Sequence, residues 1–308
     1  MKIAFIEPGL HVCGGIRRII ETSNRLVDFG HDVYIFTPKG VPTTWLPIRS
    51  KVLKLSKIRR YKFDVALFNL AEQYTIAAEV RATRKFFWVL APEAMYKHPE
   101  IPKQALNGPF FLIANSTFTV NYCKQFSKKI KQKTIPIVPG GINPEHFKYD
   151  KDIPKHYHIM YYGSWRPWKG KDLIEQAISP LQLKTINMEV TNPPQEQIYK
   201  LYNTATTYVS MGQIEGFNFP ILEAMACGCP VVCNDDGGSR DFVVHGKNAW
   251  VVPRTVSGIR AGVNLLLNNK PLRRILTAGG LKTVNQPQYL WENAAEKLEK
   301  IFEECEIT

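Results

Sequence analysis

Residues 2–37 read KIAFIEPGLHVCGGIRRIIETSNRLVDFGHDVYIFT and carry the pattern of a strand, a helix and a second strand. The apolar run at 2–6 leads into a glycine-bearing loop, residues 16–29 repeat apolar side chains at helical spacing, and residues 33–37 are apolar again. Gly30 stands where a helix commonly ends, because glycine adopts a positive φ without steric cost. The stretch therefore predicts a βαβ unit and a parallel α/β sheet.

The same alternation continues through both halves of the chain. Apolar runs that fit buried strands recur at 64–70, 85–91, 109–115, 158–164, 185–190, 206–211, 229–234 and 249–253. A stretch rich in Pro, Gly and charge near 141–156 separates the two series and is typical of a linker. We expect two parallel-sheet, Rossmann-like domains at 1–152 and 153–287, followed by an amphipathic C-terminal helix within 288–308.

The composition excludes several classes of protein. Apolar residues make up 44% and charged residues 22% of the 308 residues, which is ordinary globular usage rather than that of a disordered chain. No apolar run approaches the roughly 20 residues that cross a bilayer, and Glu7 and Pro8 interrupt the start before a signal peptide could form. The 6 cysteines are too sparse for a disulfide scaffold. We expect a cytoplasmic protein with reduced, buried or half-buried thiols.

The positive charge is concentrated in the first half of the chain. Residues 1–152 hold 24 Lys and Arg against 12 Asp and Glu, whereas residues 153–308 hold 16 against 15. The excess gathers at 49–62 and at 124–133, and such a surface attracts anionic headgroups, acidic glycans or phosphates. No nucleic-acid-binding motif accompanies it, so nucleic acid is not expected as a partner. Peripheral contact with the inner face of a membrane is one interpretation, and solvated surface lysines are the other.

Residues 210–232, SMGQIEGFNFPILEAMACGCPVV, carry the most informative chemical pattern. A strand ending near Met211 leads into a loop that contains Glu215, and Pro220 suits the first position of a helix. A helix that starts beside Asn218 or Phe219 would point its N–H groups and positive dipole end at the loop, which favours phosphate. We expect Glu223 in the first turn, where its carboxylate can accept hydrogen bonds from vicinal hydroxyls such as those of a ribose.

The block at 215–232 resembles the Glu-x7-Glu signature of glycosyltransferase family 4, and similar elements run from about residue 3 to about residue 302. Members of that family are retaining nucleotide-sugar transferases with the GT-B fold, in which two Rossmann-like domains face each other across a cleft and a C-terminal helix crosses back to the first domain. The resemblance implies that Glu223 binds the donor ribose and that Glu215 contacts the donor sugar. It places further donor contacts at Gly216, Phe217, Asn218, Phe219 and Leu222.

Residues 161–177, YYGSWRPWKGKDLIEQA, resemble the strand, loop and helix with which this family supplies an arginine and a lysine to the donor diphosphate. The resemblance assigns these roles to Arg166 and Lys169. Two cations beside the diphosphate would stabilise the charge that grows as the glycosidic bond breaks. No metal and no prosthetic group is therefore expected, and the donor is expected to be UDP- or GDP-linked.

The other expected contacts lie outside these two segments. Gly14 and Gly15, in a loop before the first helix, resemble the glycine pair that lets the backbone approach donor phosphates. Thr191 stands near the segment expected to contact the nucleotide base. The family's first-domain histidine has no counterpart here, and Glu93 is the candidate acceptor-side group, with a glutamate at a helix start as the alternative.

These patterns predict a retaining hexosyl or pentosyl transferase that moves a sugar from a nucleoside diphosphate to a glycan or lipid-linked acceptor in surface polysaccharide or glycolipid synthesis. Two alternatives remain open. One is another enzyme of the same fold, either a nucleotide-sugar epimerase, which needs no acceptor, or a phosphorylase, which needs lysine-bound pyridoxal phosphate. The other is an inactive relative that binds nucleotide only.

Overall fold

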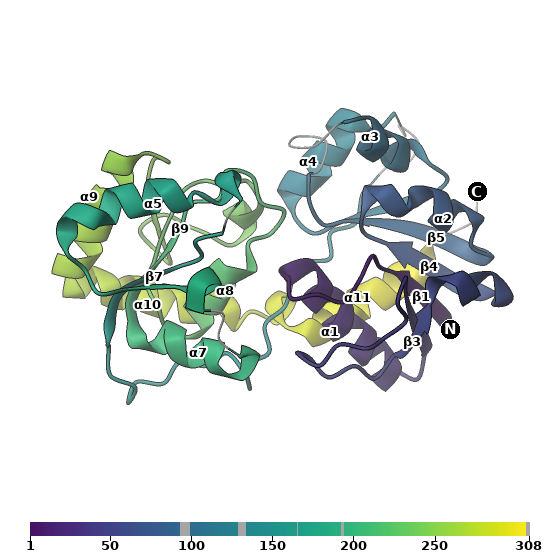
Figure 1. Ribbon diagram of the computed structural model, residues 1–308, viewed down its shortest axis with the longest axis horizontal. Coiled ribbons are helices and arrows are strands. Elements are labelled where there is room, and N and C mark those ends of the chain that lie inside the picture. The colour runs from purple at the N-terminus through teal and green to yellow at the C-terminus, as the bar shows by residue number, and fades with distance from the viewer. Residues whose placement is uncertain (93–98, 129–133, 165, 192–193, 306–308) are drawn as a thin grey trace. The chain divides into compact units, whose positions relative to one another are not determined.

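A computed structural model describes residues 1–92, 99–128, 134–164, 166–191 and 194–305 of the chain. The chain divides into two compact units (Figure 1). The first unit comprises residues 1–141 and 291–308, and the second comprises residues 142–290. No described helix combines the length and the apolar content that crossing a bilayer requires.

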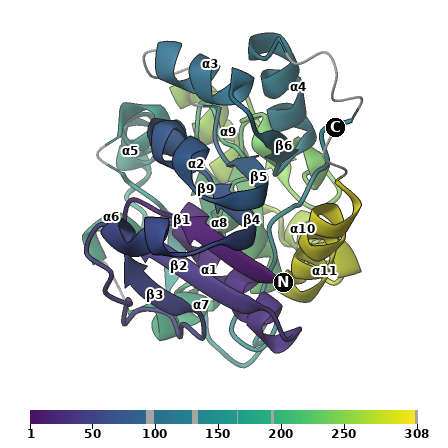
Figure 2. The ribbon, with the colours of Figure 1, turned by 90° about the vertical axis from the view of Figure 1, so that its right-hand side faces the viewer.

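The described strands of the first unit form a six-stranded parallel sheet of order β3-β2-β1-β4-β5-β6 (Figure 2). The strands are β1 (Lys2–Ile6), β2 (Asp32–Thr37), β3 (Lys51–Lys54), β4 (Phe63–Phe68), β5 (Ala82–Val89) and β6 (Phe111–Ala114). The helical segments are α1 (Gly14–Asp28), η1 (Leu55–Arg60), η2 (Ala71–Gln73), α2 (Tyr74–Glu79), α3 (Glu100–Asn107), α4 (Thr117–Phe126) and α11 (Trp291–Glu304), where η marks a 3-10 turn.

The predicted βαβ unit is present, with one correction at the start of its helix. Strand β1 pairs in parallel with β2, and Gly30 adopts a φ of 87° just after α1. Gly14 and Gly15 are the first two residues of α1, not part of the preceding loop. The reason is that extended Cys13 caps the helix, its Sγ accepting a hydrogen bond from the Ile16 N–H at 3.5 Å, so the helix begins two residues earlier than the apolar periodicity indicates.

The edge strand β3 is not predicted from the sequence, because its residues, Lys-Val-Leu-Lys, lack a buried apolar run. It pairs in parallel with β2 and continues into η1. All the basic residues expected to cluster here are exposed, namely Arg49, Lys51, Lys54, Lys57, Arg59, Arg60 and Lys62. Charged side chains of this kind protect an exposed sheet edge from pairing with other chains. We call residues 49–62 the basic edge.

The described strands of the second unit form a five-stranded parallel sheet of order β11-β10-β9-β7-β8. The strands are β7 (Tyr157–Tyr161), β8 (Thr185–Asn187), β9 (Ala205–Ser210), β10 (Val231–Cys233) and β11 (Trp250–Val251). The helical segments are η4 (Pro167–Lys169), α5 (Lys171–Ile178), η5 (Ser179–Leu181), α6 (Met188–Thr191), α7 (Gln195–Thr204), α8 (Phe219–Ala226), η6 (Gly238–Asp241), α9 (Val256–Asn268), α10 (Lys270–Val284) and η7 (Pro287–Tyr289).

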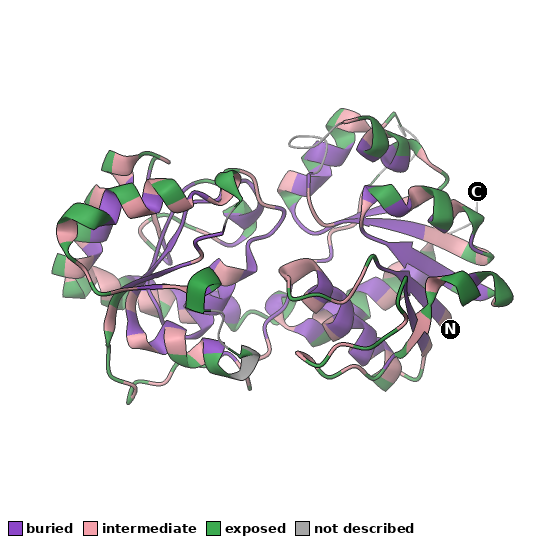
Figure 3. Ribbon diagram, in the orientation of Figure 1, coloured by how far each residue is buried: buried purple, intermediate pink, exposed green. Residues whose placement is uncertain are grey.

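The central strands of both sheets are largely buried, as the apolar runs predict for parallel strands, and most exposed residues lie on helices and loops (Figure 3). One run is shorter than expected. The predicted strand at 185–190 ends at Asn187, because Met188–Thr191 turn into the short helix α6. The predicted burial of the thiols is confirmed: of the six cysteines, which are free in this structure, four are buried and two are half-buried.

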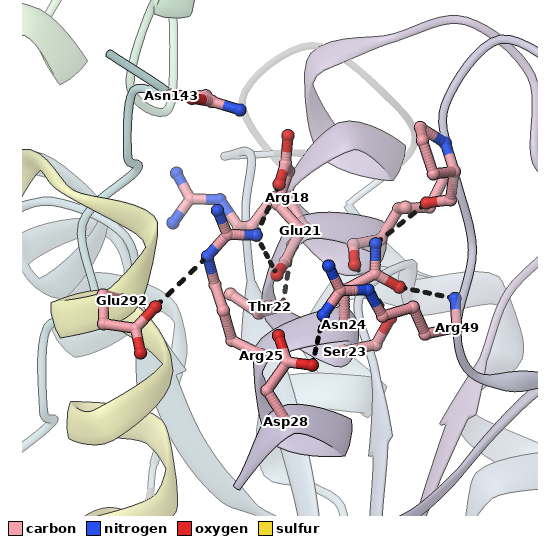
Figure 4. A network of polar contacts seen from close by, with 12 residues as sticks. Arg18, Glu21, Thr22, Ser23, Asn24, Arg25, Asp28, Arg49, Asn143 and Glu292 are labelled. Carbon is pink, nitrogen blue, oxygen red and sulfur yellow. Dashed lines mark hydrogen bonds and ion pairs between the residues drawn. The ribbon is translucent and has the colours of Figure 1, made fainter. Parts of the chain in front are cut away.

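The C-terminal helix packs against the first unit, as predicted. In the interior, Phe302 is fully buried with its ring centroid 5.1 Å from that of Phe86. At the surface, the His31 Nε2 lies 2.6 Å from the Glu299 Oε1. Arg25 on α1 approaches Glu292 on α11 at 3.8 Å (Figure 4). The helix is therefore an integral part of the first unit's core, although it follows the second unit in the chain.

Candidate functional site

The candidate site lies at the carboxyl edge of the second unit's sheet. Strands β7 and β9 are neighbours in that sheet and run in parallel, so the loops that follow them emerge at the same edge. The loop after β7 carries η4, and the loop after β9 carries Glu215 and leads into α8. This topology brings together side chains that are far apart in the sequence.

Lys169 and Glu215 form the charged centre of the site. The Lys169 Nζ lies 2.7 Å from Oε1 and 2.9 Å from Oε2 of Glu215. The Lys169 side chain is 32% exposed and that of Glu215 only 14%, so the pair is partly withdrawn from water. Charge-assisted hydrogen bonds of this length are about twice as strong as neutral ones. The structure thus brings together two of the residues that the sequence assigns to the donor.

Several contacts to backbone groups fix the loops after β7 and β9 relative to each other. The Gln213 N–H donates to the Trp168 carbonyl at 2.7 Å. Gly170 has a φ of 78°, and a Cβ there would lie 2.4 Å from the Met211 carbonyl oxygen. Arg254 joins both loops, because its Nε donates to Met211 O at 2.9 Å and its Nη2 to Trp168 O at 3.4 Å. No motif in the sequence points to Arg254, so its structural role is visible only in the fold.

Residues 215–218, here called the Glu215–Asn218 loop, rest on the segment that follows β10. The Glu215 N–H donates to the Asp236 carbonyl at 3.0 Å. Gly238 packs so closely that an added Cβ would lie 2.4 Å from the Glu215 carbonyl oxygen. Gly212 leaves room for the Glu215 side chain, since a Cβ there would lie 2.5 Å from Oε1. Two glycines and one backbone hydrogen bond therefore set the position of Glu215.

Asn218 connects this loop to α8. Its backbone is left-handed, with φ 69° and ψ 65°, and its Nδ2 donates to Asp236 Oδ2 at 2.6 Å and to Ser210 Oγ at 3.1 Å. Helix α8 begins at Phe219, as predicted, with Pro220 as its second residue rather than its first. Asp236 is 2% exposed, and burial raises its pKa to about 6. The sequence gives no signal for Asp236.

Glu223 requires a correction. It is the fifth residue of α8 and lies beyond the first turn, because Phe219–Leu222 occupy that turn. It is only 5% exposed, and its Oε2 accepts a hydrogen bond from the Tyr202 hydroxyl at 3.0 Å. Burial and the neighbouring Glu223 carboxylate raise the pKa of Tyr202 well above its usual value, so that hydroxyl remains a donor. A tyrosine side chain thus holds this carboxylate within the protein.

The remaining candidates in the second unit are arranged as follows. Arg166 is exposed immediately before η4, and its carbonyl accepts a hydrogen bond from the Lys169 N–H at 3.0 Å. Thr191 is exposed at the end of α6, where its Oγ1 donates to Asn187 O at 2.9 Å. The side chains of four further candidates are buried or absent, which leaves the backbone as their means of contact: Gly216, Phe217, Phe219 and Leu222.

Three candidates belong to the first part of the chain. Gly14 and Gly15 lie at the start of α1 in the first unit. Glu93 lies outside the described residues. Among the described residues, no group of three or more His, Cys, Asp and Glu side chains is placed to hold a metal ion.

Residues 181–283 match the sequence profile of the family described as "Glycosyl transferases group 1". This range lies within the second unit and contains both Glu215 and Glu223. The chain is 40% identical over 100 residues to O-antigen chain mannosyltransferase B of Escherichia coli, a match that covers 32% of this chain and 26% of that protein. The chain spans about a quarter of the length of this relative and less than two thirds of the next curated relatives it matches.

Solved structures share the fold over nearly the whole chain. Sucrose-phosphate synthase from Thermosynechococcus elongatus aligns with a TM-score of 0.81 at 16% identity, covering 98% of each chain. Anabaena HepE in complex with UDP and glucose aligns with a TM-score of 0.76 at 15% identity, covering 99% of this chain and 100% of that one. At this level of identity the likeness concerns the fold. Residues 181–283 are thus similar to the group 1 glycosyl transferases, and the chain has the GT-B fold of two Rossmann-like parallel-sheet domains.

Proposed function

We propose that this protein is a retaining, metal-independent glycosyltransferase that moves a sugar from a nucleoside diphosphate to a glycan or lipid-linked acceptor. The observation that carries the proposal is the Lys169–Glu215 pair beside the N-terminus of α8, with Glu215 and α8 inside the range that matches the family. An anion at that N-terminus would meet backbone N–H groups, the positive end of the helix dipole and the Lys169 ammonium together.

In the proposed reaction, the bond between the anomeric carbon and the departing phosphate oxygen breaks while the acceptor oxygen bonds to that carbon on the same face. The acceptor proton passes to the departing phosphate oxygen. Lys169 and Arg166 would stabilise the negative charge that develops on the diphosphate. Glu215 would contact the sugar hydroxyls, and Glu223 would contact the ribose. This charge distribution is the reason for proposing a reaction that needs no metal.

The class of acceptor is proposed from the relatives and from the charge of the first unit. One relative carries the name of an O-antigen chain mannosyltransferase, and one protein of the same fold has been solved with UDP and glucose. We infer a UDP- or GDP-linked hexose or pentose as donor and a place in surface polysaccharide or glycolipid synthesis.

The basic edge supports a peripheral membrane contact as part of this proposal. Lys51 and Arg59 form ion pairs with Asp32 and Glu79, and Arg49 pairs with Asp28. The other four basic side chains show no ion pair within the described residues: Lys54, Lys57, Arg60 and Lys62. Flotation with anionic liposomes should show binding that weakens with salt and is lost when these four are replaced by glutamate. Binding equal to that on neutral liposomes would remove the support for a membrane contact.

Calorimetric titration with UDP, GDP and ADP, followed by turnover of the matching nucleotide sugars, tests the proposed activity. A transferase consumes donor quickly only when an acceptor is present. An epimerase would consume donor without any acceptor. A protein that binds nucleotide yet never turns over donor would be the inactive relative, and a protein that binds none of the nucleotides would contradict the proposal.

A further inference from the structure

Asp236 is a buried acid that contacts two residues of the Glu215–Asn218 loop in the candidate donor site. Its carbonyl accepts the Glu215 N–H at 3.0 Å, and its Oδ2 accepts Asn218 Nδ2 at 2.6 Å. Its Oδ1 accepts both the N–H and the hydroxyl of Ser239, each at 2.8 Å. The side chain is thus bonded in one direction to the Glu215–Asn218 loop and in the other to η6. One residue therefore links the two segments.

The Asn218 end of this link lies at the point of greatest backbone strain in the site. Asn218 is one of two described non-glycine residues with a positive φ, and it directly precedes α8. The left-handed conformation costs free energy for any residue with a Cβ, although asparagine tolerates it better than most. The hydrogen bonds from its Nδ2 to Asp236 and Ser210 offset that cost. They also fix the direction in which α8 leaves the loop.

The neighbouring Asp235 is an acid of the same segment whose side chain bonds to Arg240 and not to the Glu215–Asn218 loop. Its side chain is 51% exposed and forms two hydrogen bonds with Arg240, at 2.7 Å and 2.8 Å. Asp236 is buried instead, which costs free energy unless the carboxylate is well hydrogen-bonded. The adjacent acids therefore have the same chemistry but different partners.

We propose that Asp236 is a positioning residue of the donor site, holding the Glu215–Asn218 loop and the first turn of α8 in the conformation that receives the nucleoside diphosphate sugar. This inference rests on the proposed function. Asp236 itself is not proposed to touch the donor. It acts through Asn218 and through the Glu215 backbone, so its loss weakens donor binding rather than removing a reacting group.

The protonation of Asp236 supplies an independent readout. Burial, with a smaller contribution from the nearby Glu215 carboxylate, raises its pKa to about 6. The other titratable or charged groups that interact with Asp236 are Arg240 and Cys233. Loss of its charge weakens the bond from Asn218, so donor affinity is expected to fall as the pH drops through about 6. Because the pKa is raised in the folded state, the same protonation favours folding, and stability should not fall with affinity over this range.

The test measures binding of UDP-glucose and GDP-mannose, whose phosphodiester groups do not titrate between pH 5 and 8. Asp236→Ala should weaken binding of the accepted donor by about tenfold, and Asp235→Ala, the matched control, by less than about twofold. The fall in affinity between pH 7 and pH 5 should persist in Asp235→Ala and be reduced in Asp236→Ala. Equal affinities and equal pH profiles for the two variants would overturn the proposal.

Asn218→Gly keeps the test decisive if Asp236→Ala does not fold, because glycine accepts the positive φ and only the amide is lost. It too should weaken donor binding. The donor affinity of the double variant should equal that of the more weakly binding single variant, because both substitutions remove the same Asn218–Asp236 hydrogen bond. Unchanged binding in Asn218→Gly would overturn the inference alone. Failure of the wild-type chain to bind either donor would overturn the proposed function together with it.

Discussion

Lys169 and Glu215 form an ion pair in which one ammonium bonds to both oxygens of one carboxylate, at 2.7 Å and 2.9 Å. The two residues come from loops after neighbouring parallel strands, so the fold, not the sequence distance, places them together. A donor diphosphate that reaches Lys169 would share a cation that Glu215 already orients. The pair therefore couples the proposed diphosphate contact to the proposed sugar contact.

Glu215→Gln should separate these two contacts. The change keeps the shape of the side chain and removes its charge, so donor binding should stay within a few-fold of wild type while turnover falls by about 100-fold or more. Calorimetry with the donor and a steady-state assay with donor and acceptor measure the two quantities. Turnover close to that of wild type would show that Glu215 does not have its assigned role.

Lys169→Met, in contrast, should change mainly the affinity for the donor. Removing the ammonium takes away the charge that would meet the diphosphate and leaves Glu215 without this partner, so donor affinity should fall by about tenfold or more. Lys282→Met is the control, because Lys282 is an exposed lysine on α10 of the same unit. Equal affinities of the two variants would argue against a diphosphate contact at Lys169.

The residues that could be predicted from the sequence are those whose local pattern carries chemistry. Glu215, the start of α8 and the parallel strands on either side of it follow from an apolar run, a loop and a proline. Asp236, Tyr202 and Arg254 could not be found in this way, because each acts through a contact with a residue distant in the chain. Only the folded sheet shows which of the many charged and aromatic side chains reach the site.

The same limit explains the errors at segment boundaries. The start of α1 depends on a cap by Cys13, and the end of β8 depends on a short helix that follows it. Periodicity reports which side chains are buried, whereas a boundary is decided by a single cap or turn. The exposed edge strand β3 lacks that periodicity, so only its pairing with β2 identifies it as a strand.

Tyr202→Phe should reduce the preference for ribose over 2′-deoxyribose. The Tyr202 hydroxyl bonds to Glu223 Oε2 at 3.0 Å, and Glu223 is the proposed ribose contact. Without that hydroxyl the carboxylate is less fixed, and the ratio of the Kd values for 2′-deoxy-UDP and UDP should fall by about threefold to tenfold.

Tyr161→Phe provides a matched control for this change. It removes another tyrosine–glutamate bond of 3.0 Å, formed with Glu175 on α5 of the same unit. The control should leave the ribose preference unchanged. A ribose preference that is unchanged in both variants would mean that Glu223 does not contact the ribose, or that the Tyr202 hydroxyl does not position Glu223.

Glu7 should make the stability of the first unit depend on pH. It is fully buried after β1, and burial raises its pKa from 4.5 to about 8, although hydrogen bonds from Asn69 Nδ2 to both oxygens partly oppose this. The folded state therefore holds a proton that the unfolded state has lost, and the free energy of unfolding should fall as the pH rises from about 4.5 to about 8.

Glu7→Gln cannot titrate and should gain stability relative to wild type as the pH is raised across that range. Urea unfolding at pH 5 and pH 8 measures the difference. Asn69→Ala removes the bonds that lower the pKa, so it should steepen the dependence on pH rather than remove it. A stability difference between Glu7→Gln and wild type that is the same at both pH values would contradict the raised pKa.

Phe302→Ala should destabilise the first unit although the residue follows the second unit in the chain. Phe302 on α11 is fully buried and lies 5.1 Å from the equally buried Phe86 on β5, so the change leaves a cavity beside the sheet and should cost about 3 to 5 kcal/mol in the free energy of unfolding. Lys297→Ala on the exposed face of the same helix should cost less than about 0.5 kcal/mol. Urea unfolding of the two variants at pH 7 compares them directly. Equal stabilities of the two variants would show that α11 is not part of the core, because substitutions at its buried and exposed positions differ in cost only if the helix packs through its buried face.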